Sequence, residues 1–72
     1  MQSFVINKNM QANGDHEVHN TTTGCSYMPL AENQIALGSH LTCIGAVSAA
    51  RSNWPNERIN GCFYCCNPCH TS

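Results

Sequence analysis

The chain has 72 residues, of which three are basic and four are acidic, so its formal net charge is −1. A chain of this length forms one small domain at most. The scarcity of lysine and arginine argues against nucleic-acid binding, because that function requires a basic surface that neutralises phosphates. A fold this small buries little apolar surface, so the six cysteines indicate that disulfides or a metal ion stabilise it.

The N-terminal third of the chain predicts a β-hairpin. Residues 3–7 form a short strand around Phe4, Val5 and Ile6. Residues 15–19 alternate in polarity and form the second strand, and an Asn-Gly turn signal at positions 13 and 14 precedes it. The two strands should therefore pair with each other.

The middle of the chain predicts a third strand and one helix. Residues 34–38 are the candidate strand, and residues 41–52 carry apolar side chains at helical spacing. The side-chain oxygen of Ser39 or Thr42 can cap the start of this helix, and Pro55 ends it. The expected buried stripe of the helix consists of Leu41, Ile44, Val47 and Ala50.

These elements predict an α+β fold with a small β-sheet of two to three strands, one helix and a C-terminal cysteine knuckle. We expect a single domain over residues 1–72, with residues 1–3 and 70–72 flexible. Ile59 should pack into the core from a short extended segment, and the Asn-Gly pair at positions 60 and 61 predicts a turn.

The C-terminal segment carries the strongest chemical signal. A Cys-x2-Cys pair can grip one zinc ion from a tight turn, and a glycine before the first cysteine lets the backbone turn so that amide groups point at sulfur. The alternative is a disulfide cluster, and the sequence cannot choose among the pairings that six cysteines allow. The residues concerned are Gly61, Cys62, Cys65, Cys66, Cys69 and His70.

A complete zinc site needs two further ligands, and three upstream pairs compete for this role. His19 and Cys25 stand at the two ends of a threonine-rich loop, where ligands can converge. His40 and Cys43 could share the first turn of the helix. His16 and His19 would point to opposite faces of a strand, so that pair ranks last.

Several of these residues also have structural explanations. Cys43 is expected to be a small buried residue of the helix. His16 and His40 are expected to be surface or hydrogen-bonded imidazoles, and His70 a flexible terminal residue. Trp54 should cover the edge of the core rather than bind a ligand.

The order of motifs in this chain resembles the small zinc module of Ada-type DNA-repair proteins. The motifs are His19-x5-Cys25, then a strand, then a helix with Ala46 in its first half, and finally Gly61-Cys62-x2-Cys65. The resemblance covers about residues 15–66. It implies a zinc ion held by His19, Cys25, Cys62 and Cys65. It departs from the family at His19, where the family has the cysteine that accepts a methyl group, and in lacking the basic residues that would bind DNA.

A second resemblance is to small bacterial cysteine-rich proteins that end in Cys-His-Thr-Ser, and it implies no activity. The N-terminus shows no signal-peptide pattern, and no stretch is long and apolar enough to cross a membrane, so we expect a cytoplasmic protein with reduced thiols.

The expected function is a zinc-binding structural or protein-interaction module rather than an enzyme, and the expected partner is a protein. The alternatives are a secreted, disulfide-stapled toxin or inhibitor and a thiol- or methyl-accepting protein. The four carboxylates are scattered along the chain and form no recognisable catalytic set.

Overall fold

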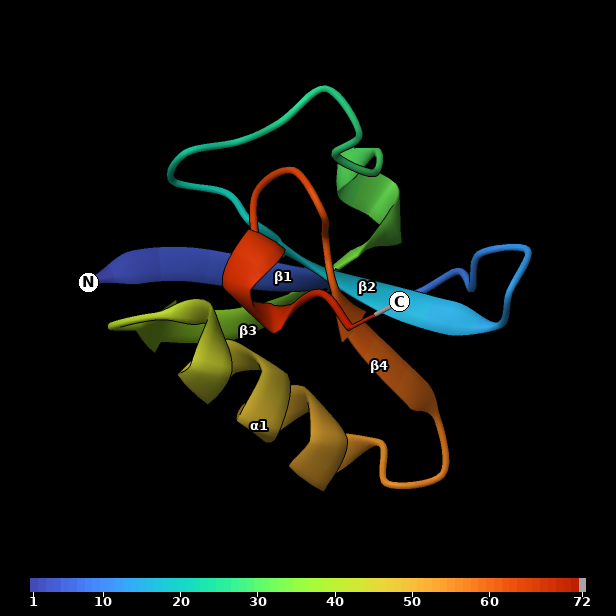
Figure 1. The fold of residues 1–72 in the computed structure, drawn as a ribbon. Coiled ribbons are helices and arrows are strands. Elements are labelled where there is room, and N and C mark those ends of the chain that lie inside the picture. Colours follow the sequence, from blue (N-terminus) through green and yellow to red (C-terminus); the bar gives the residue numbers. More distant parts are fainter. Residues whose placement is uncertain (72) are drawn as a thin grey trace.

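A computed structural model describes residues 1–71 of the chain. It has an α+β fold in which one helix packs on a four-stranded mixed sheet of order β3-β1-β2-β4 (Figure 1). Two short 3-10 turns, Ala31–Asn33 and Asn67–Cys69, complete the order of elements. The bounds of the main elements are β1 Gln2–Asn7, β2 Asp15–Asn20, β3 Gln34–His40, α1 Cys43–Asn53 and β4 Arg58–Gly61.

The predicted hairpin and third strand are present. β1 and β2 pair antiparallel, with Phe4 opposite Asn20 and Ile6 opposite Val18. The turn between them places Gly14 at φ +91°, a conformation that glycine adopts without steric cost. β3 pairs with the other edge of β1, so β1 is a central strand, which explains its run of three buried apolar residues.

The sheet has four strands, and the prediction of two to three was too low. The additional strand is β4, which pairs in parallel with β2, with Ile59 opposite His16 and Gly61 opposite Val18. The Asn60-Gly61 pair therefore lies in a strand, where a turn was expected. A four-residue strand with one large apolar side chain has little local signal, because its partner lies about 40 residues away in the chain.

α1 begins at Cys43, two residues later than predicted, and Thr42 caps it by accepting a hydrogen bond from Ile44 N at 3.3 Å. The predicted buried stripe is wrong in its first half, because Leu41 and Ile44 are 72% and 69% exposed. The side chains that α1 buries are Cys43, Ala46, Val47 and Ala50.

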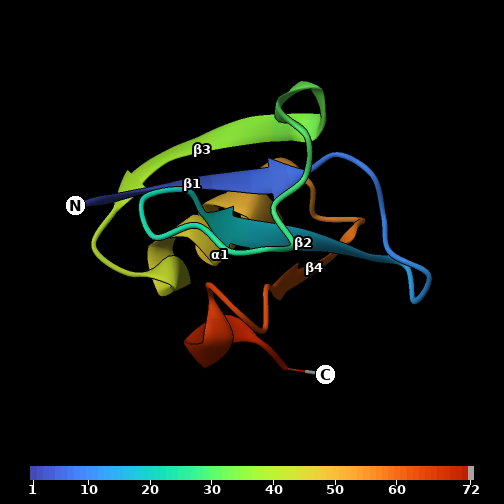
Figure 2. The ribbon, with the colours of Figure 1, turned by 90° about the horizontal axis from the view of Figure 1, so that it is seen from above.

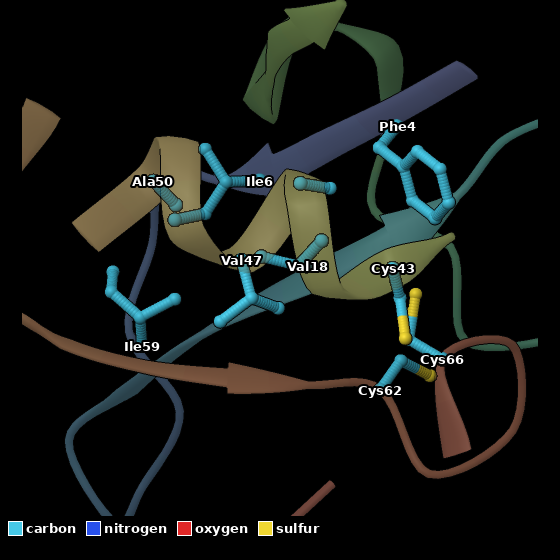
Figure 3. Close-up of a cluster of buried hydrophobic side chains, with 10 residues drawn as sticks. Phe4, Ile6, Val18, Cys43, Val47, Ala50, Ile59, Cys62 and Cys66 are labelled. Carbon is cyan, nitrogen blue, oxygen red and sulfur yellow. The ribbon is translucent and has the colours of Figure 1, made fainter. Parts of the chain in front are cut away.

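The hydrophobic core lies between α1 and one face of the sheet. Phe4, Ile6 and Val18 reach it from the hairpin, and Ile59 and Val47 reach it from β4 and α1 (Figure 3). Cys62 and Cys66 close the core at the end of β4. Trp54 packs against the edge of this core, as expected.

The opposite face of the sheet is covered by the loop that follows β2, while α1 lies on the other side (Figures 1 and 2). Gln2 and Ser3 belong to β1, and the His70 Nδ1 atom lies 3.0 Å from the Gly61 carbonyl oxygen. The flexibility expected of residues 1–3 and 70–72 stays a prediction. Ser72, the last residue of the second range, lies outside the described residues. No helix within residues 1–71 has the length and apolar character needed to span a bilayer.

Candidate metal centre

Two neighbouring parallel strands position the candidate metal ligands. Because β2 and β4 are parallel, their carboxyl ends meet at one edge of the sheet. His19 is the penultimate residue of β2, and Cys62 directly follows β4, where its amide donates to the Val18 carbonyl at 2.9 Å. The pairing of these two strands therefore brings an imidazole and a thiol together from opposite halves of the chain.

A tight turn after β2 supplies Cys25. The Asn20 side-chain oxygen accepts hydrogen bonds from Thr22 N and Thr23 N, at 2.9 and 3.2 Å. Gly24 then adopts φ +69°, and its amide donates to the Asn20 carbonyl at 2.9 Å. This local network folds the threonine-rich loop back on itself, so Cys25 returns toward the strand that it has just left.

The structure brings together all four residues that the resemblance implied, His19, Cys25, Cys62 and Cys65. Their ligand atoms lie within 4.8 Å of one another, and the group could hold a metal ion. The Cys25 and Cys62 sulfurs are 3.8 Å apart, and the His19 Nδ1 atom lies 3.9 Å from Cys25 Sγ and 3.6 Å from Cys65 Sγ.

These separations can be compared with those of a tetrahedral zinc site. Zinc–sulfur bonds of about 2.3 Å and zinc–nitrogen bonds of about 2.05 Å place two sulfurs about 3.8 Å apart and a sulfur and a nitrogen about 3.6 Å apart. The Cys25–Cys62 and His19–Cys65 separations match these values, and the His19–Cys25 separation is longer by a few tenths of an ångström. Two of the three separations therefore equal those of a tetrahedral zinc site, and all four ligand atoms lie within 4.8 Å of one another.

Backbone amides point at two of the sulfurs. Tyr64 N lies 3.4 Å from Cys62 Sγ, and Asn20 N lies 3.3 Å from Cys65 Sγ. Hydrogen bonds of this kind favour the charged thiolate, which is the form that binds metal. The Cys66 amide also donates to the Cys62 carbonyl at 2.8 Å, which closes the turn of the cysteine knuckle.

Gly61 has a different role from the one expected of it. It is the last residue of β4 and has no positive φ, so it does not serve as a flexible turn residue. A Cβ atom at this position would lie 2.7 Å from Cys69 Cβ and 2.8 Å from the Cys66 carbonyl oxygen. Glycine is required here because the C-terminal segment packs directly against the backbone of β4.

His19 is oriented by a carboxylate that the sequence did not single out. Its Nδ1 atom faces the thiols, while its Nε2 atom lies 3.6 Å from Glu17 Oε1 on the side away from them. A carboxylate behind the second ring nitrogen is the arrangement that orients histidine ligands in metal sites. The sequence feature that could have identified Glu17 is its position two residues before His19 in the same strand, because residues at this spacing lie on the same face of a sheet.

Burial sets the protonation of the metal-free site. Desolvation lowers the pKa of His19, so the ring stays neutral and keeps a lone pair for a metal. Desolvation also raises the pKa of the Cys62 and Cys65 thiols. A metal ion must therefore displace thiol protons when it binds.

The competing ligand pairs are not assembled. The His40 Nε2 atom lies 2.8 Å from the Leu37 carbonyl oxygen, and Cys43 forms a disulfide with Cys69. The His16 Nδ1 atom lies 3.0 Å from the Asn7 carbonyl oxygen. Both histidines are thus hydrogen-bonded imidazoles, as the alternative interpretation expected.

The cysteines divide between two roles that the sequence had treated as alternatives. Cys43 is buried, as predicted, but it also cross-links the start of α1 to the C-terminal 3-10 turn through Cys69. Cys66 is buried next to the site as a free thiol outside the ligand group. No spacing rule predicts the Cys43–Cys69 pairing, because it joins elements 26 residues apart.

Searches of protein-family models, curated proteins and solved structures found no match to this chain.

Proposed function

We propose that this chain is a zinc-stabilised interaction module, in which His19, Cys25, Cys62 and Cys65 hold one structural zinc ion. The observation that carries the proposal is the gathering of four ligand atoms within 4.8 Å of one another, of which the Cys25–Cys62 and His19–Cys65 separations match a tetrahedral zinc shell. Three thiols and one imidazole are also the donor set that soft, tetrahedral zinc sites use.

A structural role follows from the number of ligands. Four protein side chains fill the tetrahedral shell and leave no open position for water or substrate. The ion joins the end of β2 to the segment that follows β4, and such an ion contributes on the order of 10 kcal/mol to the folded state. This contribution is large beside the stability that a chain of 72 residues obtains from its core.

The module fits a protein partner better than a nucleic acid. The chain has three basic residues, and Arg58 already pairs with Asp15 through an Nε–Oδ1 distance of 2.9 Å. The methyl-acceptor alternative needs a thiolate that a reagent can reach, so it would have to use Cys25 or Cys65, which are partly exposed, rather than the buried Cys62.

The test is native mass spectrometry of anaerobically prepared, zinc-reconstituted protein with the Cys43–Cys69 disulfide intact. We expect one zinc ion per chain. Cys65→Ala should lose the ion, whereas Cys66→Ala is the matched control, because it removes the adjacent thiol from outside the ligand group. His19→Gln should also lose the ion, with His40→Gln as its control. A wild-type chain without zinc, or ligand variants with wild-type zinc affinity, would refute the proposal.

A second candidate is supported by the disulfide. Cys43–Cys69 is the kind of cross-link that persists in oxidising compartments, which favours the secreted, stapled class. The four free cysteines favour the reducing cytoplasm, where we place the protein. Intact mass measured after rapid alkylation in cell lysate separates the two, because each disulfide lowers the mass by about two daltons. Complete oxidation of all six cysteines would establish the stapled protein instead.

A further inference from the structure

An aromatic hollow lies on the sheet face opposite α1, beside the candidate metal centre. It has a volume of about 360 Å³. Two loops border it, namely the first ligand loop (residues 20–28), which covers the sheet on the side away from α1 in Figure 1, and the second ligand loop (residues 62–66), which follows β4. The lining residues are Asn7, Gln11, Glu17, His19, Tyr27, Phe63 and Tyr64.

The wall of the hollow is built from three aromatic rings that remain largely exposed. Tyr27 and Tyr64 stack with their ring centroids 4.3 Å apart and an interplanar angle of 19°. Phe63 meets Tyr64 edge-on at 5.2 Å. The side chains of Tyr27, Phe63 and Tyr64 are 60%, 54% and 61% exposed, although packing usually buries rings of this size. A cluster of exposed rings is typical of an interaction surface.

The rings come from both ligand loops. Tyr27 follows Cys25 by two residues, and Phe63 and Tyr64 lie between Cys62 and Cys65. The Tyr27–Tyr64 stack therefore spans the two loops that the metal ion would join. This placement makes the surface depend on the metal centre, since loops that separate cannot keep their rings in contact.

The electrostatic character of the hollow selects its occupant. Its lining contains one carboxylate, Glu17, and neither lysine nor arginine. Aromatic faces attract cations, and a carboxylate in the lining of the hollow adds to that attraction. A nucleobase would also stack on the rings, but its phosphate would find no basic partner among the residues that line the hollow.

We propose that this aromatic hollow binds an arginine side chain of a partner polypeptide, an inference that rests on the proposed zinc module because the metal joins the two loops. Arginine fits better than lysine, because its planar guanidinium stacks on aromatic rings while donating hydrogen bonds to a carboxylate. Within the hollow, the guanidinium contacts Tyr64 and Phe63 and donates to Glu17.

The test titrates a blocked Gly-Arg-Gly peptide into zinc-saturated protein and follows amide and ring signals by NMR. We expect saturable, millimolar binding that shifts the signals of Phe63, Tyr64 and Glu17. The same peptide with citrulline in place of arginine keeps the shape and removes the charge, so its shifts should be clearly weaker. Methylguanidinium tests the cation without a polypeptide and should bind more weakly than the arginine peptide.

Matched variants locate the binding. Tyr64→Ala should weaken binding roughly two- to fivefold, which is the value of one cation–π contact at an exposed site. Leu41→Ala, which alters an exposed apolar residue elsewhere, should leave it unchanged. Glu17→Gln should weaken binding, whereas Glu57→Gln should not, because Glu57 faces His16 outside the hollow.

Zinc content is measured for every sample, so the two proposals fail separately. A zinc-loaded protein that does not bind the arginine peptide, or that binds the citrulline peptide equally, refutes the arginine site and leaves the zinc module standing. Equal binding by methylguanidinium refutes the polypeptide partner. A chain that takes up no zinc refutes the module, and unchanged peptide binding by that chain refutes the dependence on metal.

Discussion

The number of protons that zinc displaces tests the ligand set directly. Three of the proposed ligands are thiols, and each must lose a proton to bind as a thiolate. Burial raises the pKa of Cys62 and Cys65, so these thiols are protonated in the metal-free protein at neutral pH. Burial lowers the pKa of His19, so this ligand is already neutral and releases almost none. We therefore expect about three protons per zinc ion at pH 7.

The same count fixes how the affinity depends on pH. Each released proton changes the binding free energy by about 1.4 kcal/mol per pH unit, so three protons give about 4 kcal/mol per unit. The sign is definite, because protons compete with zinc for the sulfurs, and the affinity falls as the pH falls. Because the pKa of His19 is lowered, protons compete with zinc for its ring nitrogen only when the pH drops below the usual histidine range.

The assay is isothermal titration calorimetry of zinc into metal-free protein, in buffers with different ionisation enthalpies. The slope of the observed enthalpy against the buffer enthalpy gives the number of protons. About two protons or fewer would show that one of the three thiols is not a ligand. About four would show that Cys66 has replaced His19, and Cys66→Ala is the control that should leave the count unchanged.

Three further predictions concern residues around the site. Glu17→Gln should lower zinc affinity at least about tenfold, because the carboxylate orients His19; competition with a chromophoric chelator measures this, and an unchanged affinity would contradict it. Gly61→Ala should lower the unfolding midpoint in urea, with a cost on the order of 1–3 kcal/mol, because the added Cβ overlaps Cys69 and the Cys66 carbonyl; wild-type stability would refute this packing. Replacing Cys43 and Cys69 together by alanine should cost about 3.5 kcal/mol, the loop-closure value for 26 residues, and urea unfolding that matches the wild type would exclude the cross-link.

Local patterns in the sequence were sufficient for the elements that short-range interactions form. The hairpin follows from one apolar strand and one strand of alternating polarity around a turn, and its register is that of an ordinary antiparallel pair. The helix follows from apolar spacing and from a cap predicted at Ser39 or Thr42, of which the structure shows Thr42. The Cys-x2-Cys spacing likewise predicted a compact turn, and the structure forms one that is closed by the Cys66 amide.

The buried face of α1 could not be decided in this way. The stripe through Leu41 and Ile44 and the stripe through Cys43 and Ala46 have the same helical period and share their last two members, Val47 and Ala50. Tertiary packing selected the second stripe, because the small residues let the helix approach the sheet and Cys43 can reach Cys69.

The sequence alone thus determined the fold class, the hairpin, the helix and the presence of cysteine chemistry near Cys62. Only the tertiary structure decided that β4 joins β2 in parallel, which is the step that carries Cys62 to His19. It also decided which cysteines form the disulfide and which join His19 in the group that could hold a metal ion. These outcomes depend on contacts between residues that are distant in the chain. Such contacts form only when the whole molecule packs, so local sequence patterns do not reveal which of the possible contacts is the most stable.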